Sequence, residues 1–199
     1  MALEGKKVGI LIESDFYEEE IYYYKHRFPE EGMELHFLSR LWGQPYLTFH
    51  GHEYKNPMEC HESFENMSDD ELRSYAAIIV PSAIVSDRLR YTEDINKLSP
   101  AVEFLKRAFA ERDIIKGIIC HGMWLVSPAP ELVRGRRVTG HINLYGDIKN
   151  MGAIYTNEDV TADWSDSAGY LVTGRTGGHC HLFARKIIDL IYEKEKATV

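Results

Sequence analysis

The chain has 199 residues, of which 44% are apolar, and its 31 acidic and 23 basic side chains give a net charge of −8. A chain of this length and apolar content can bury one substantial core, so we expect a single domain over residues 1–199. The negative charge repels phosphate backbones and anionic lipids, which argues against nucleic acid and membrane partners. The N-terminal apolar stretch is too short for a signal or spanning segment, and three cysteines suit a reducing compartment. We therefore expect a cytoplasmic protein without a disulfide framework.

The first third of the chain alternates strand and helix patterns. Residues 7–13 form a continuous apolar run, typical of a strand covered on both faces. Residues 18–31 follow with apolar side chains at helical spacing, and residues 34–40 alternate as a second strand. Residues 42–60 contain glycine, proline and aromatic residues without a helical period, which predicts an excursion from the domain, built as a hairpin.

The same alternation continues to the C-terminus. Ser68 caps a predicted short helix over 68–75, residues 76–81 form a buried strand, and residues 92–112 form a long helix that has Pro100 near its start. The remaining predicted elements are a strand at 114–120, a short helix from His121, a strand at 136–141, a helix at 142–151, paired strands at 152–163 and 170–175, and a closing helix at 178–193. This order predicts an α/β fold with a mostly parallel central sheet and helices on both of its faces.

Cys120 stands at the carboxyl end of a predicted strand, where the loops of a parallel sheet open into a crevice. Gly117 and Gly122 flank it and permit a sharp strand-to-helix turn of the kind that exposes a nucleophile. The positive end of the following helix favours the thiolate, which is the attacking form, so we expect an ionised and reactive thiol. The alternative is a buried structural cysteine, which is common in proteins.

Two further groups are candidates for a catalytic position beside Cys120. Glu18, Glu19 and Glu20 follow the first strand and either project one carboxylate into the crevice or form a solvated acidic helix start. His121 directly follows Cys120, but neighbouring side chains on a helix do not face each other, so adjacency alone is weak evidence for a base.

Histidines and cysteines also lie close together elsewhere in the sequence. They lack the paired spacing of a structural zinc site, and two ligands one residue apart on a strand point to opposite faces. We therefore expect no metal site, and the cysteine chemistry described below requires no organic cofactor either. The residues concerned are His50, His52, Cys60, His61, His179, Cys180 and His181.

Four motifs resemble the ThiJ/PfpI superfamily: GIICHG at 117–122, PELVRGRRVTGH at 130–141, YLVTGR at 170–175 and VGILIESDFYEEEI at 8–21. The resemblance spans nearly the whole chain and is strongest around Cys120. This superfamily includes PfpI-like intracellular peptidases, glyoxalase III enzymes and the parkinsonism-associated deglycase, and it has a class I glutamine amidotransferase-like fold. The resemblance implies a flavodoxin-like three-layer α/β/α sandwich.

The resemblance also implies roles for particular residues. The superfamily's nucleophile falls on Cys120 and its neighbouring histidine on His121. The glutamate that contacts the cysteine falls on Glu20, with Glu18 as the alternative, and a carboxyl that close to a thiolate is expected to carry a proton.

Further site positions follow from the same resemblance. The superfamily has Pro-Gly-Gly where this chain has Pro81-Ser82-Ala83, so the backbone N–H groups of Ser82 and Ala83 correspond to the oxyanion site, although their Cβ atoms penalise positive φ and crowd the crevice. His141 falls where other members carry an active-site histidine, or is an ordinary surface histidine, and His179 is expected to line the site. Asp87 falls where PfpI-like peptidases supply a glutamate from a neighbouring subunit.

These observations predict a cysteine-dependent enzyme that acts on a small electrophilic carbonyl compound, as glyoxalase III-like or deglycase-like members do. Cys120 adds to the carbonyl to give a hemithioacetal, while Glu20 and His121 move protons. One alternative is a PfpI-like peptidase or amidase whose site is completed by oligomerisation into a dimer or higher homo-oligomer. The other is a redox sensor in stress response, in which Cys120 is oxidised and the substituted glycines mark lost catalysis.

Overall fold

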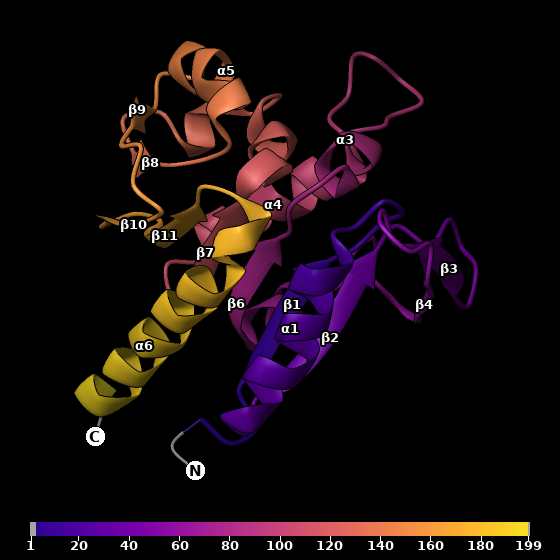
Figure 1. Cartoon of the computed structure of the whole chain (residues 1–199), viewed down its shortest axis with the longest axis horizontal. Helices are drawn as coiled ribbons and strands as arrows, with labels where there is room; N and C mark the ends of the chain where they lie inside the picture. The colour runs from indigo at the N-terminus through magenta and orange to yellow at the C-terminus, as the bar shows by residue number, and fades with distance from the viewer. Residues whose placement is uncertain (1–2, 199) are drawn as a thin grey trace.

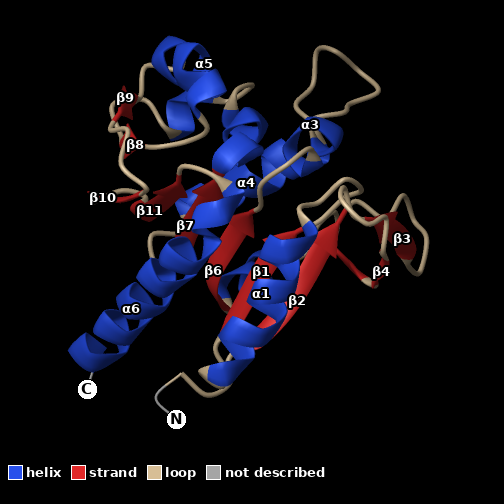
Figure 2. Ribbon diagram, in the orientation of Figure 1, coloured by secondary structure: helices blue, strands red, loops and turns tan. Residues whose placement is uncertain are grey.

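The molecule is built around a central sheet flanked by helices (Figures 1 and 2), and the computed structural model describes residues 3–198. The strands are β1 (Lys7–Leu11), β2 (Glu34–Ser39), β3 (Leu47–His50), β4 (Pro57–Cys60), β5 (Glu62–Ser63), β6 (Tyr75–Val80), β7 (Ile115–Ile119), β8 (Arg137–Val138), β9 (Ile154–Tyr155), β10 (Val160–Ser165) and β11 (Gly169–Gly174). The α-helices are α1 (Glu18–Glu30), α2 (Asp69–Arg73), α3 (Val85–Leu89), α4 (Pro100–Ala110), α5 (Tyr145–Asn150) and α6 (Cys180–Thr198). Short 3-10 helices are η1 (Cys120–Val126), η2 (Pro130–Leu132), η3 (Ile142–Leu144) and η4 (Gly177–His179).

The main sheet has seven strands in the order β10-β11-β7-β6-β1-β2-β5, and β10 is the strand that runs antiparallel to its neighbour. Helices α1 and α6 pack together over one face, and α4 packs with α3 and η1 on the other side (Figure 2). The predicted three-layer α/β/α sandwich with a mostly parallel sheet is confirmed. Because the chain leaves β1 toward β2 on one side and returns to β6 on the other, a crevice is expected at the carboxyl ends of β1 and β6.

The central strands are buried because both of their faces are covered. Val8 and Ile10 of β1, Ile79 of β6 and Ile118 of β7 have no exposed surface. Each is part of a continuous apolar run, as expected for parallel strands packed between two layers of helices. No helix in the described part of the chain is long and apolar enough to cross a membrane.

Local capping and turn signals explain several elements. The Ser68 hydroxyl accepts a hydrogen bond from the backbone N–H of Glu71 at 3.1 Å, so the predicted cap of α2 is confirmed. The excursion at 42–60 contains the predicted hairpin, in which β3 and β4 pair antiparallel from Leu47 with Cys60 to His50 with Pro57.

Predicted boundaries are wrong at two elements, and a third element was not predicted. The helix expected over 92–112 begins only at Pro100, because the Ser99 hydroxyl accepts a hydrogen bond from the backbone N–H of Val102 at 3.4 Å and caps the helix there. The strand expected over 136–141 shortens to β8, because the backbone N–H of Thr139 turns to the Thr173 hydroxyl at 2.8 Å. Helix α3 was not predicted.

Candidate active site

Cys120 occupies a sharp turn at the carboxyl end of β7. Its backbone has φ 58°, a left-handed conformation that costs a side-chain-bearing residue about 1–2 kcal/mol. The turn packs directly against the end of β6, because a Cβ added at Gly122 would lie 2.9 Å from the carbonyl oxygen of Val80 and 3.0 Å from that of Pro81. The strand-to-helix turn predicted from the flanking glycines is therefore present, although the helix that follows is the 3-10 helix η1.

Backbone N–H groups from three segments face the Cys120 sulfur and favour its ionised form: those of Gly177, His121 and Ala83. Burial nevertheless has the larger effect and raises the pKa of the Cys120 thiol, whose residue is 7% exposed. The charge of Glu20 raises this pKa further. The expectation of an ionised thiol is thus not met in this structure, because desolvation outweighs the N–H groups.

Glu20 lies fully buried in the first turn of α1. Its Oε2 accepts a hydrogen bond from the backbone N–H of Ser82 at 3.0 Å and a second from the Ser82 hydroxyl, while Oε1 has no partner in the described part of the chain. Burial raises the pKa of Glu20 to about 7, against the lowering effect of Ser82. Within residues 3–198 no hydrogen bond joins Glu20 to Cys120, so the carboxyl acts on the sulfur through its charge.

The bond to Glu20 also changes the expected oxyanion site. Since the Ser82 N–H donates to the carboxyl, it is not available for an oxyanion. Gly177 supplies an N–H in its place, which the sequence reasoning missed. The available signal was the glycine pair before the last helix.

The His121 side chain also lies close to the Cys120 sulfur. Its Nδ1 lies 3.4 Å from the Cys120 sulfur, a contact that becomes possible because the left-handed backbone of Cys120 breaks the helical spacing of neighbouring side chains. The His121 ring packs against those of His141 and Trp124, at centroid distances of 4.6 Å and 4.8 Å. Burial lowers the pKa of His121, as does the charge of His141, so this imidazole is favoured in its neutral, proton-accepting form.

Of the other predicted site residues, His141 lies beside His121, whereas His179 and Asp87 have other surroundings. His141 accepts a hydrogen bond from the backbone N–H of Asn143 at 3.3 Å and caps η3. His179 bonds the Thr176 hydroxyl at 2.8 Å and lies 3.4 Å from Asp159, and no contact between it and Cys120 is seen among the described residues. Asp87 is exposed on α3.

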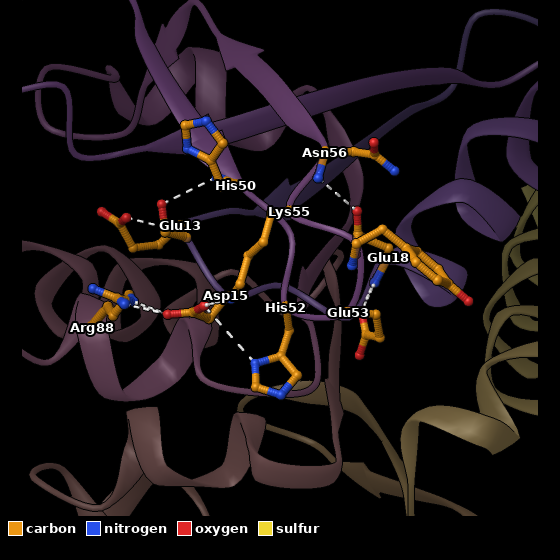
Figure 3. A network of polar contacts seen from close by, with 11 residues as sticks. Glu13, Asp15, Glu18, His50, His52, Glu53, Lys55, Asn56 and Arg88 are labelled. Carbon is orange, nitrogen blue, oxygen red and sulfur yellow. Dashed lines mark hydrogen bonds and ion pairs between the residues drawn. The ribbon is translucent and has the colours of Figure 1, made fainter.

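Glu18 does not face the cysteine. Its buried carboxylate accepts hydrogen bonds from the backbone N–H groups of Tyr54 and Asn56, the latter at 3.0 Å, in the hairpin loop 51–56 (Figure 3). Burial alone raises the pKa of Glu18, but these donors prevail and the net pKa is lowered. Both earlier interpretations of Glu18, a site carboxyl or a solvated helix start, are therefore wrong, because this side chain anchors the hairpin. We call residues 51–56 the strap.

A second contact holds the strap beside the end of β1. The Asp15 carboxylate pairs with Lys55 of the strap at 3.1 Å and with Arg88 of α3 (Figure 3). The Asp15 carbonyl accepts from the backbone N–H of Ile84 at 3.3 Å, one residue after Ala83. Hydrogen bonds and ion pairs thus connect the strap to the start of α1, to the end of β1 and to the segment after β6.

Glu18→Gln is expected to loosen the strap, because an amide cannot accept both N–H groups as a carboxylate does. Loss of charge-assisted hydrogen bonds should accelerate amide hydrogen exchange in residues 51–56 by roughly tenfold or more. In the native chain, the lowered pKa means that the stabilisation is present above the ordinary value of 4.5 and is lost as the pH falls below it. Exchange measured by mass spectrometry would contradict this if the variant matched the native strap.

Metal binding finds no support in the arrangement of side chains. Within residues 3–198 there is no group of three or more His, Cys, Asp or Glu that could hold a metal ion.

The sequence profile of the DJ-1/PfpI family matches residues 6–190. The chain belongs to the DJ-1/PfpI family. It is similar to deglycase PfpI of Pyrococcus furiosus, with 27% identity over 186 residues that cover 93% of this chain and 99% of the relative. A deglycase of Pyrococcus abyssi is 29% identical over 185 residues, with coverage of 93% and 99%. The solved structure of a ThiJ/PfpI domain protein from Brachyspira murdochii is similar in fold, with a TM-score of 0.75 at 16% identity and coverage of 96% and 98%.

Ala83 stands where the resemblance to the DJ-1/PfpI family places the second glycine of Pro-Gly-Gly. The structure keeps the backbone conformation that suits glycine, since Ala83 has φ 62°, and its N–H still faces the Cys120 sulfur. The added methyl group is therefore accommodated at the cost of local strain and does not abolish the expected N–H geometry.

Ala83→Gly is expected to stabilise the protein by about 1 kcal/mol, because the strain removed exceeds the extra freedom gained by the unfolded chain. Urea denaturation measures this change. An unchanged or lowered midpoint would show that Ala83 is not strained in solution.

Proposed function

We propose that the protein is a cysteine-dependent enzyme of the deglycase type, which acts on small electrophilic carbonyl compounds or their adducts with amines. Membership of the DJ-1/PfpI family and relatives named deglycases over nearly their whole length support an enzyme of this kind. The single observation that carries the proposal is the environment of the Cys120 sulfur. It is faced by three backbone N–H groups, lies 3.4 Å from an imidazole nitrogen, and stands within electrostatic range of a carboxyl with a pKa of about 7.

The proposed reaction begins when the Cys120 thiol gives its proton to His121 Nδ1 and the sulfur adds to an aldehyde carbon. The carbonyl oxygen becomes an oxyanion, which the N–H groups of Ala83, His121 and Gly177 stabilise before it is protonated to a hemithioacetal. With an α-oxoaldehyde, the Glu20 carboxyl then moves the proton of the first carbon to the second carbon, and the hydroxyl proton of the hemithioacetal passes to the oxygen of the second carbon, which leaves a 2-hydroxy thioester on Cys120. Water hydrolyses the thioester, so that substrate plus water gives a 2-hydroxy acid without an external oxidant.

The test supplies the full-length protein with methylglyoxal, and separately with an amino acid glycated by methylglyoxal. Lactate formation from either compound, with release of free amine from the second, is the expected result. Absence of lactate from both substrates would exclude this function.

One observation supports a peptidase or amidase as the second candidate. The Ser86 hydroxyl of α3 donates to the carbonyl oxygen of His121 at 2.7 Å, which ties this helix to the cysteine turn. The next residue, Asp87, is exposed, as a carboxylate that completes a neighbouring subunit's site must be. An acyl group trapped on Cys120 from a small amide, together with a homo-oligomer in light scattering, would favour this candidate.

A further inference from the structure

Ser82 places two hydrogen-bond donors on one oxygen of the Glu20 carboxyl. Its backbone N–H lies 3.0 Å from Oε2, and its hydroxyl donates to the same atom. Oε1 is buried without a partner in the described part of the chain. The two oxygens therefore have different environments, because both Ser82 donors lie at Oε2.

The groups that interact electrostatically with this carboxyl come from three elements. Tyr24, one turn along α1, has a buried hydroxyl that makes no regular hydrogen bond within residues 3–198, yet as a nearby donor it lowers the pKa of Glu20, as the Ser82 donors do. Cys120 after β7 and Cys180 at the start of α6 both have a pKa raised first by burial and then by Glu20, among other contributions. No cation pairs with Glu20 within the described residues, and its negative charge raises the pKa of both thiols.

The charge on Glu20 controls the sulfur through simple electrostatics. An ionised carboxylate in a buried site disfavours a second negative charge nearby, and a protonated carboxyl does not. The two Ser82 donors stabilise the ionised form of Glu20 and so oppose burial, which favours the neutral form. A glycine at position 82 lacks the hydroxyl and keeps only one of these donors.

We propose that Ser82 is a positioning residue whose hydroxyl favours the ionised form of the Glu20 carboxyl, against the effect of burial, and thereby restrains ionisation of the Cys120 thiol. This role rests on the proposed function, in which Glu20 and Cys120 serve one reaction. As a consequence, the Cys120 thiol reacts more slowly with alkylating agents and with peroxide at neutral pH than it would beside a protonated glutamic acid. Since the hydroxyl is the group that acts, its removal should make the cysteine more reactive.

Ser82→Ala tests this because it removes the hydroxyl and keeps the Cβ and the N–H. The pKa of Glu20 should rise and that of Cys120 should fall. Iodoacetamide alkylation of Cys120, followed by mass spectrometry from about pH 6 to about pH 10, should be about three- to tenfold faster than in the native protein near pH 7.5. A purely structural role for Ser82 would lower the melting temperature without moving this pH profile.

Two comparisons make the result decisive. Ser82→Gly should show the same shift, and it supplies the answer if the alanine variant does not fold. In a Glu20→Gln background, Ser82→Ala should leave the alkylation profile unchanged, because the titrating carboxyl is gone. An unmoved profile in both single variants, or equal acceleration in the Glu20→Gln background, would overturn the proposal.

The alkylation assay is independent of turnover, because it uses no substrate. A protein that forms no lactate yet shows the shifted profile would refute the proposed function and leave the role of Ser82 intact. If the protein forms lactate but the alkylation profile of the Ser82 variants does not shift, the role of Ser82 is refuted and the proposed function stands.

Discussion

Cys120→Ala is expected to reduce lactate formation by roughly a thousandfold or more, because no other nucleophile replaces the sulfur at the turn after β7. The carbonyl substrate then meets the same N–H groups but forms no covalent adduct. Steady-state kinetics with methylglyoxal measure the loss, and intact-protein mass spectrometry checks that the native chain, and not the variant, accumulates an adduct.

Cys60→Ser is the matched control for this experiment. The Cys60 thiol donates to the carbonyl oxygen of Phe37 at 3.2 Å in the hairpin region, and a serine hydroxyl can make the same bond. Turnover should stay close to that of the native protein. Equal losses in the two variants would mean that a cysteine is needed for folding rather than for chemistry, and retained turnover in Cys120→Ala would refute the mechanism.

Gly122→Ala is the second change with a large expected effect. Its new Cβ would lie 2.9 Å from the Val80 carbonyl oxygen and 3.0 Å from that of Pro81, and backbone atoms cannot swing aside as a side chain can. The substitution should push the segment 81–83 away from Cys120. We expect a loss of about 1–3 kcal/mol in the free energy of unfolding, together with a severe loss of turnover. Urea denaturation and the lactate assay measure the two effects.

Gly146→Ala provides the corresponding control. Gly146 lies in α5 with no heavy atom within 4 Å of an added Cβ, and alanine favours a helix by about 0.5–1 kcal/mol over glycine. This variant should be slightly more stable and fully active. The interpretation of the Cys120 turn would fail if the two glycine substitutions had the same effect.

The order of strands and helices was predictable because each element carries a local pattern. Continuous apolar runs mark the buried parallel strands, and Ser68 marks the start of α2 by its own side chain. Where two local patterns conflict, the prediction is wrong. Apolar spacing from Leu98 extended the helix before Pro100, although a serine followed by proline is also a start signal, and in the structure that signal prevails.

The site was less predictable because its contacts join distant segments. Cys120 was predicted from its place at a strand end and its flanking glycines, and Glu20 from the resemblance to a family. The bond from Ser82 to Glu20, however, spans 62 residues, and the anchor from Glu18 to Asn56 spans 38. No local pattern marks a carboxylate that will accept backbone N–H groups from so far away.

Lys116 illustrates the same difficulty outside the site. It lies in the apolar run of β7 and is buried, with its ammonium bonded to the carbonyl oxygens of Glu111, at 3.1 Å, and Ala168. Burial lowers its pKa to about 7. The sequence shows that a charged residue lies within a strand. Only the folded chain shows which carbonyl oxygens accept hydrogen bonds from its ammonium group.

The redox-sensor alternative requires a thiol that ionises easily. The raised pKa of Cys120 weighs against that alternative in the isolated chain. An enzyme tolerates such a thiol, since His121 takes the proton as the sulfur attacks.

The anchored strap has a consequence for engineering the protein. Glu18, which binds the strap, and Glu20 share the first turn of α1. Redesign of residues 51–56 would therefore change the position of the Glu20 carboxyl. The stretch 42–46 on the other side of the hairpin is exposed, and there new sequence of varied length can be grafted while the chemistry is left alone.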